Sequence, residues 1–275
     1  MKELSLTLFG QNIWGNMPGT STVSNRNAAV AELIWAYDAD VVAFQECNPQ
    51  TSRKGDVDIA QLIYDKYDEV CAPFAYMNFT PVFYKRERFL ILDSGFLPYP
   101  GKNDMNSKSL TYAVLCDRES GIRFGFISTH FWWQNKDAED NLQRIEHAKI
   151  LLAGIDMLKS KYDVPVFATG DLNCGKLSDQ GEEPYLYLTE YLLDIKEIAP
   201  ISTDVLTHHE YPEYGEGGLY VPPADKEPKR TLDHMFATAH RCLAVDSFTV
   251  DTSDTAYLSS DHFPLIAEVR IVSED

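Results

Sequence analysis

The sequence predicts an α/β fold made of two similar halves. In each half a helix leads directly into a short apolar strand that ends in a carboxylate. The first such strand, residues 40–46, ends in Glu46, and the second, residues 164–171, ends in Asp171. Short apolar runs bounded by polar residues are typical of buried strands. Repeated helix-to-strand units favour a layered α/β arrangement in which the two strand ends meet.

The composition is that of a globular protein with an acidic surface. The 275 residues are 44% hydrophobic and 12% aromatic, which is enough to bury a substantial core. The net charge of -18 argues against nucleic-acid binding through a basic surface, although bound cations could still meet phosphate. The five cysteines predict neither a disulfide framework nor a zinc site, since they are far apart. Without a membrane-length apolar stretch or a signal peptide, a cytoplasmic location is expected.

The chain begins with an alternating strand at residues 4–9, which leads to Asn12. Asn12 is a possible metal or phosphate ligand, but a lone asparagine in a loop is more typical of a turn. A helix is predicted at residues 25–37, with Ser24 as its N-cap and an apolar face that packs on a sheet.

Glu46 follows an amide at a strand end, where a carboxylate suits a hard cation such as magnesium. A solvated strand end is the alternative for this residue. Further along, the sequence predicts a short helix within residues 56–67, two strands between residues 71 and 93, and a turn-rich surface loop at residues 98–108.

A hairpin is predicted from strands at residues 110–116 and 122–129, and its second strand leads to His130. A histidine at a strand end suits a phosphate contact or proton donation, although a structural role is the commoner one. Trp132 and Trp133 follow, and each could stack on a substrate or cover the core.

The longest predicted helix, residues 136–160, starts with acidic residues that favour the helix dipole. Its predicted apolar face consists of Leu142, Ile145, Leu152 and Ile155. This helix leads into the strand that carries Asp171.

Asp171 and Asn173 lie two residues apart, so in an extended chain both side chains point to one face. The carboxylate can accept a proton, and the amide can donate a hydrogen bond to an oxyanion. A Gly-Asp-x-Asn sequence is also an ordinary turn, so this motif gains weight only from the rest of the chain.

A further helix is predicted to begin at Pro184 and to end near residue 194. Residues 200–230 predict a long loop that faces the substrate. His208 and His209 within it are adjacent, so they point in different directions and do not make a metal pair by spacing.

Two Asp-His pairs near the end of the chain complete a set of polar residues at predicted strand ends. The set is Asn12, Glu46, His130, Asp171, Asn173, Asp233, Asp261 and His262. Metal-assisted attack of water on a phosphate ester needs carboxylates for a cation, a base, and donors for the charged transition state. The set supplies all three.

These motifs, in this order, resemble the endonuclease/exonuclease/phosphatase superfamily, whose fold is DNase I-like. The matching segments are Gln11-Asn12-Ile13-Trp14, Gln45-Glu46, Ser128-Thr129-His130, Gly170-Asp171-Leu172-Asn173, Leu232-Asp233-His234 and Ser260-Asp261-His262-Phe263-Pro264. The resemblance implies a four-layered α/β sandwich, with two central and mostly antiparallel β-sheets flanked by helices. It also implies a single domain over residues 1–275.

The resemblance further implies that Glu46, with Asn12 and Asp261, binds Mg²⁺ or Mn²⁺. It implies that Asp171 and His262 share the activation of water, and leaves open which of them is the base.

In the same resemblance Asp233 orients His262. Asn173 and His130 contact the scissile phosphate.

We therefore expect a metal-dependent phosphohydrolase that cleaves a phosphodiester or phosphomonoester, most readily of a small molecule or headgroup. Aromatic residues are candidates to line its pocket: Trp14, Trp132, Trp133, Tyr214 and Tyr220. A nuclease is the alternative within the same chemistry, with these aromatics stacking on bases. It is not favoured, because the loop at residues 200–230 is acidic and no basic insertion is present. A non-catalytic binding protein on the same fold is the third possibility, and no protein partner is implied.

Overall fold

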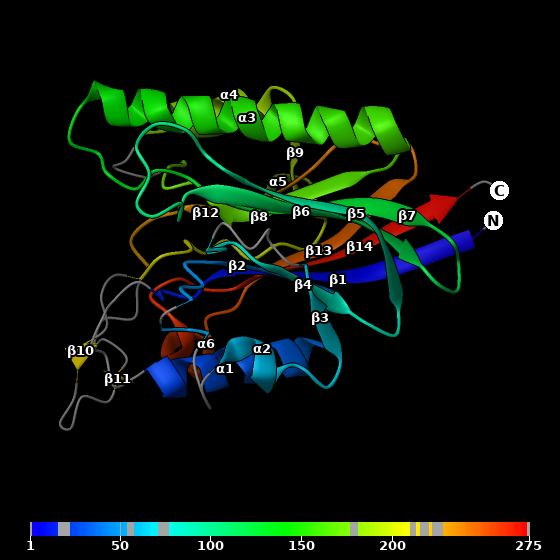
Figure 1. The fold of residues 1–275 in the computed structure, drawn as a ribbon, viewed down its shortest axis with the longest axis horizontal. Coiled ribbons are helices and arrows are strands. Elements are labelled where there is room, and N and C mark those ends of the chain that lie inside the picture. Colours follow the sequence, from blue (N-terminus) through cyan, green and yellow to red (C-terminus); the bar gives the residue numbers. More distant parts are fainter. Residues whose placement is uncertain are drawn as a thin grey trace.

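The computed structural model describes residues 2–15, 23–49, 51–53, 58–70, 77–176, 181–209, 213–214, 220–221 and 228–273. Two six-stranded mixed sheets lie face to face, and helices cover both outer faces (Figure 1). This confirms the four-layered α/β sandwich. None of the helices in the described ranges is long and apolar enough to cross a membrane.

The first sheet has the strand order β13-β14-β1-β2-β4-β3. Its strands are β1 (Lys2–Asn12), β2 (Val41–Gln45), β3 (Tyr67–Glu69), β4 (Val82–Lys85), β13 (Leu243–Val250) and β14 (Leu265–Ser273). Strands β1 and β2 run parallel and are joined by helix α1 (Val23–Tyr37). All other neighbours in this sheet are antiparallel.

The second sheet repeats this plan with the order β5-β6-β7-β8-β12-β9. Its strands are β5 (Phe89–Pro98), β6 (Ser109–Asp117), β7 (Arg123–His130), β8 (Val166–Asp171), β9 (Leu193–Asp194) and β12 (Asp233–Ala237). Strands β7 and β8 form its parallel pair and are joined by helix α3 (Ala138–Tyr162). The predicted hairpin consists of β6 and β7. The two predicted helix-to-strand units are α1–β2 and α3–β8, and their strands lie at the centres of the two sheets.

Short elements complete the layers. Helices α1, α2 (Ile59–Leu62) and α6 (Asp254–Ser259) lie outside the first sheet, whereas α3 and α4 (Glu183–Thr189) lie outside the second (Figure 1). Helix α5 (Ile195–Ile198) follows β9, and β10 (Glu213–Tyr214) pairs with β11 (Tyr220–Val221) in a separate ribbon. Helix α1 begins at Val23, so Ser24 lies inside the helix and is not the predicted N-cap.

The two sheets are joined closely at one end. Gly10 of β1 faces Thr169 of β8, and a Cβ atom at position 10 would lie 2.4 Å from the threonine Oγ1. Gln45 Nε2 of β2 donates a hydrogen bond to Ser128 Oγ of β7 at 3.0 Å. These contacts lie next to the ends of the four central strands, where the predicted site residues follow.

The buried face of α3 differs from the predicted one. Leu142, expected in the core, is 59% exposed, whereas the buried residues are Asp140, Arg144, His147, Ala148, Leu151, Ile155 and Leu158. The prediction is confirmed for Ile155 and was wrong for Leu142, because three polar residues occupy the N-terminal half of the buried stripe and apolar periodicity alone selects the neighbouring face there.

Arg144 fastens α3 to the segment that follows β7. Its guanidinium donates hydrogen bonds to the carbonyl of Gln134 at 2.6 Å and to Asn135 Oδ1 at 3.3 Å. We expect Arg144→Met to lower the free energy of unfolding by about 2 kcal/mol, because these part-buried acceptors lose a charged donor. Urea denaturation measures this, with Lys149→Met on the exposed side of α3 as the control. Equal effects of the two substitutions would contradict this role of Arg144.

Candidate active site

The central strands deliver four polar side chains to the same end of the molecule. Strand β1 ends in Asn12, β7 in His130 and β8 in Asp171, and Glu46 directly follows β2. This end lies opposite the two chain termini (Figure 1). Ligand atoms of Glu46, His130 and Asp171 all lie within 4.8 Å of one another. The expectation that the two carboxylate-bearing strand ends meet is therefore confirmed.

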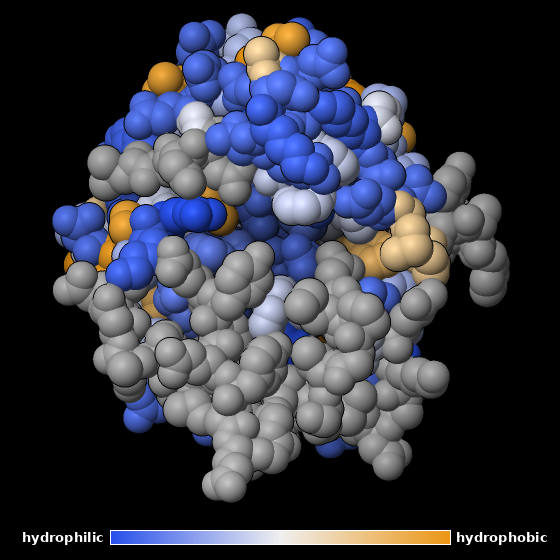
Figure 2. Space-filling view, turned by 90° about the vertical axis from the view of Figure 1, so that its left-hand side faces the viewer, coloured by the Kyte–Doolittle hydropathy of each residue, from blue (hydrophilic) through white to orange (hydrophobic). Residues whose placement is uncertain are grey.

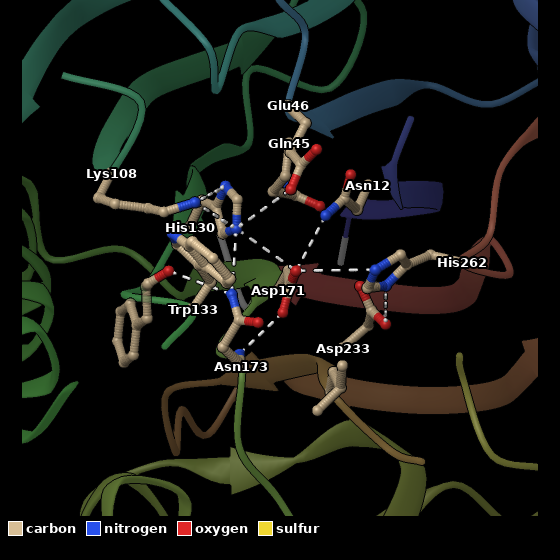
Figure 3. Close-up of polar contacts among 12 residues, drawn as sticks. Asn12, Gln45, Glu46, Lys108, His130, Trp133, Asp171, Asn173, Asp233 and His262 are labelled. Carbon is tan, nitrogen blue, oxygen red and sulfur yellow. Dashed lines mark hydrogen bonds and ion pairs between the residues drawn. The ribbon is translucent and has the colours of Figure 1, made fainter. Parts of the chain in front are cut away.

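The backbone is strained where these strands end. Glu46 has φ 52° and Asn173 has φ 50°, both in the left-handed region. This conformation costs roughly 1 kcal/mol for a residue with a Cβ, and asparagine tolerates it better than glutamate. Such strain clusters at functional sites, where surrounding contacts hold it in place. The reversal of the chain at Asn173 brings its amide back toward His130 (Figure 3).

Asp171 lies at the centre of the site (Figure 3). Its carboxylate accepts hydrogen bonds from Asn12 Nδ2 at 2.9 Å and from the backbone N–H of Asn173 at 2.8 Å. One of its oxygens lies 3.4 Å from His130 Nε2. Burial alone would raise the pKa of Asp171, but hydrogen bonding from His130 and the charge of His262 outweigh burial and hold the pKa below its usual range. Asp171 is therefore a carboxylate at neutral pH.

His262 and Asp233 form a buried hydrogen-bonded pair. The imidazole Nδ1 donates to Asp233 Oδ2 at 2.8 Å, and Thr207 Oγ1 donates to the same oxygen at 2.7 Å. The other ring nitrogen, Nε2, lies 3.9 Å from Asp171 Oδ2. Burial alone would lower the pKa of His262, but the carboxylates of Asp233 and Asp261 raise it well above its ordinary value. His262 is therefore an imidazolium at neutral pH.

His130 differs from His262 in its charge. It is fully buried, and its Nε2 lies 3.1 Å from Asn173 Nδ2 and 3.0 Å from Lys108 Nζ. Burial and the nearby ammonium lower the pKa of His130, so its ring is neutral at physiological pH. One site thus contains a neutral and a charged histidine on either side of Asp171 (Figure 3).

Asp261 lies in a cluster with His208 and His262. Its Oδ1 is 4.0 Å from His262 Nε2, and its Oδ2 is 3.8 Å from His208 Nε2. Within the described ranges, no cluster of three acidic or histidine ligands contains both Glu46 and Asp261. The clustered carboxylates of Glu46 and Asp171 nevertheless fit Mg²⁺ or Mn²⁺, which prefer oxygen donors.

Two residues of the site were not predicted. Lys108 was placed in a surface loop, yet it is buried beside His130. The hairpin register is the signal that could have found it, because the start of β6 lies next to the end of β7. His208 was set aside for its spacing, yet its ring contacts the His262 ring edge-on at 4.6 Å. Within the predicted loop, Thr207 hydrogen-bonds Asp233 and His208 bridges to His262, so this part of it lies beside the site.

The predicted aromatic lining is reduced to one exposed tryptophan among the described side chains. Trp14 and Trp132 are buried, and the Trp132 indole N–H donates to Asp140 Oδ1 at 2.7 Å. Trp133 is 47% exposed, and its indole N–H donates to Asp104 Oδ2. The side chains of the other two candidates, Tyr214 and Tyr220, lie outside the described part of the structure.

The site opens onto a hydrophilic face. Figure 2 views the molecule from the end at which the central strands finish, and hydrophilic side chains border the upper side of a central hollow there. The arrangement can therefore receive a polar ligand from solvent and present it to charged and neutral donors around one carboxylate.

Comparison with known proteins agrees with this geometry. The endonuclease/exonuclease/phosphatase family matches residues 11–262 by its sequence profile, while no curated protein matches the chain significantly. An endonuclease/exonuclease/phosphatase from Bacteroides vulgatus is similar, at 20% identity and a TM-score of 0.75, covering 98% of this chain and 100% of that chain.

Two further solved structures share the fold. A mannosyl-6-phosphatase from Bacteroides thetaiotaomicron VPI-5482 has 18% identity and a TM-score of 0.74, covering 96% of this chain and 99% of that chain. D. rerio TDP2 complexed with single-strand DNA product has 16% identity and a TM-score of 0.69, covering 96% and 98%. At these identities the likeness concerns the fold, and the family follows from the profile match across most of the chain. This protein belongs to the endonuclease/exonuclease/phosphatase family.

Proposed function

We propose that this protein is a divalent-metal-dependent phosphoester hydrolase in which water attacks phosphorus. The observation that carries this proposal is the position of Asp171, between the neutral His130 and the charged His262 and within hydrogen-bonding distance of Asn12. A carboxylate held among such donors suits attack by water on a charged ester.

The metal-binding residues in this proposal are Glu46, Asn12 and Asp261, and the ion is Mg²⁺ or Mn²⁺. Bound there, the cation supplies Lewis-acid charge to the phosphoryl oxygens. Glu46 is the most accessible of these ligands, with 17% of its side chain exposed. Its accessibility fits an ion that is shared with substrate, since Mg²⁺ keeps several positions for water and phosphate oxygens.

The opposite pKa shifts of Asp171 and His262 support a division of roles. Asp171 is the proton acceptor that orients the attacking water, because it remains a carboxylate at neutral pH. His262 is the cationic donor that stabilises charge on the phosphoryl group, and Asp233 holds its ring in place. Asn173 and His130 contribute neutral hydrogen bonds to the same group.

We expect Asp233→Asn to move the alkaline limb of the pH–kcat profile to lower pH. The wild-type limb reports loss of the His262 proton, so activity falls as pH rises through the raised pKa. Asparagine still accepts the Nδ1 hydrogen bond but lacks the negative charge that raises this pKa. A profile measured in the two proteins at saturating metal checks this expectation. An activity that instead rises with pH through the same group would make His262 the base.

A small-molecule phosphate ester is the substrate class that we favour. We also propose that the chain forms a single domain. The net charge of -18 disfavours a long polyanion, and one structure with the same fold is a mannosyl-6-phosphatase. A nuclease is the second candidate, because another structure with this fold holds a single-strand DNA product.

Hydrolysis rates on three substrate types distinguish these candidates: a set of sugar phosphates, bis-p-nitrophenyl phosphate, and a single-stranded oligonucleotide. We expect the highest kcat/KM on a sugar phosphate or another small ester. A preference for the oligonucleotide would establish the nuclease alternative. Metal binding without turnover of any of them would point to a non-catalytic binding protein.

A further inference from the structure

Lys108 is a buried cation at the edge of the site. Its side chain lies just before β6, and only 2% of the residue is exposed. The ammonium Nζ lies 3.0 Å from Nε2 and 3.3 Å from Nδ1 of His130. Across the described ranges, no carboxylate is close enough to form an ion pair with it. Lys108 differs in this respect from Lys102, whose ammonium forms an ion pair with Asp140 at 2.7 Å.

A buried ammonium without a counterion costs free energy. Desolvation of such an ion costs several kcal/mol, and only close opposite charge or good hydrogen bonding offsets it. His130 is neutral and offers Lys108 no negative charge. Burial lowers the pKa of Lys108 accordingly, while the more distant carboxylates of Glu46, Asp171 and Asp104 act in the opposite direction. In the described part of the free protein, Lys108 therefore lies near carboxylates but has none in ion-pair contact.

Hydrogen bonds with Asn103 hold the backbone of Lys108 in place. Asn103 Oδ1 accepts a hydrogen bond from the backbone N–H of Lys108 at 3.0 Å, and Asn103 Nδ2 donates to the Lys108 carbonyl at 2.8 Å. The same amide group also donates to the carbonyl of Tyr99. These bonds fix the backbone from which the ammonium extends toward His130 (Figure 3).

We propose that Lys108 is a catalytic residue that binds a non-bridging oxygen of the substrate phosphoryl group, beside His130 and Asn173. This inference rests on the proposed function and adds to it a lysine that contacts the phosphoryl group. His130 Nε2 lies 3.1 Å from Asn173 Nδ2 and 3.0 Å from Lys108 Nζ, so three nitrogen groups lie close together. Phosphate oxygens accept such donors, and an ammonium supplies the point charge that neutral donors lack.

The ligand classes that fit are a phosphate ester and its product, inorganic phosphate. Charge spreads over the non-bridging oxygens when the phosphoryl group is transferred, so a preorganised cation stabilises the transition state. Loss of one such donor lowers turnover by about 10²-fold or more. Inorganic phosphate carries the same oxygens, so its affinity reports the contact without requiring turnover.

The test compares wild type with Lys108→Met, Lys108→Gln and the control Lys149→Met on the outer side of α3. Isothermal titration with inorganic phosphate in the presence of Mg²⁺ measures binding, and hydrolysis of p-nitrophenyl phosphate gives kcat/KM. For both Lys108 variants we expect at least about tenfold weaker phosphate binding and about 10²-fold lower kcat/KM. Lys149→Met is expected to behave as wild type in both measurements.

Thermal melting separates this role from a structural one. Methionine matches the length of the lysine stem and removes the buried charge, so Lys108→Met is expected to keep or raise Tm while activity is lost. Phosphate affinity equal to that of wild type in both variants would overturn the proposal, even if hydrolysis fell. Lys108-dependent phosphate binding in a protein that hydrolyses no ester would support this inference and contradict the proposed function.

Discussion

Replacing Asp171 by asparagine is expected to lower kcat/KM for phosphate-ester hydrolysis by about 10⁴-fold or more. The substitution removes the proton acceptor, and it also removes the negative charge that faces both His130 and His262. Asparagine retains one oxygen for the backbone N–H of Asn173, but its amide nitrogen would face Asn12 Nδ2, a donor. The effect should therefore appear mainly in kcat. Steady-state kinetics at saturating metal measure it.

Asp156→Asn on α3 is the matched control, because the same change there affects a side chain that is 74% exposed. Its kcat/KM is expected to equal that of wild type. Circular dichroism and thermal melting of both variants show whether the fold is retained. A well-folded Asp171→Asn protein that keeps more than about a tenth of wild-type kcat would show that another group accepts the proton.

Chelation of divalent cations is expected to lower hydrolysis by at least about 10³-fold, since a Lewis-acid contribution is worth several kcal/mol. Added Mg²⁺ or Mn²⁺ should restore it. We expect Glu46→Gln to raise the metal concentration needed for half-maximal activity by at least about tenfold, because a neutral amide replaces the anionic ligand. Metal titrations of activity in wild type and variant measure this shift.

Glu119→Gln, in the exposed turn between β6 and β7, controls for the loss of one acidic charge. It should leave the metal titration unchanged. Activity that survives chelation, or a Glu46→Gln titration that overlays the wild-type curve, would contradict the assignment of Glu46 as a metal ligand.

The parts of the fold that could be predicted are those with short-range signals. Apolar runs that end in Glu46 and Asp171 marked the centres of the two sheets, because a buried central strand must be apolar on both faces. The polar residue that follows each run therefore had to lie at the end of a central strand. Asn173 was correctly placed beside Asp171. The two residues are brought together by the left-handed backbone at Asn173, whereas the prediction assumed an extended chain.

Other parts depend on contacts between distant segments. Nothing near Lys108 in the sequence indicates burial, since only the pairing of β6 with β7 carries it beside His130. His208 reaches His262 through a β-bridge between segments that lie more than fifty residues apart in the chain. The face of α3 was misjudged because Arg144 and His147 are buried through hydrogen bonds made with the segment after β7. Apolar periodicity records none of these interactions.

Hydrolysis of p-nitrophenyl phosphate and bis-p-nitrophenyl phosphate by wild type and His262→Ala tests the central claim most directly. Both proteins are assayed with Mg²⁺, with Mn²⁺ and with EDTA. Metal-dependent release of p-nitrophenol by wild type, lost in His262→Ala, is the predicted result, and the preferred ester separates monoesterase from diesterase. Release that is equal in the two proteins, or that persists in EDTA, would contradict a metal-dependent site built around Asp171 and His262.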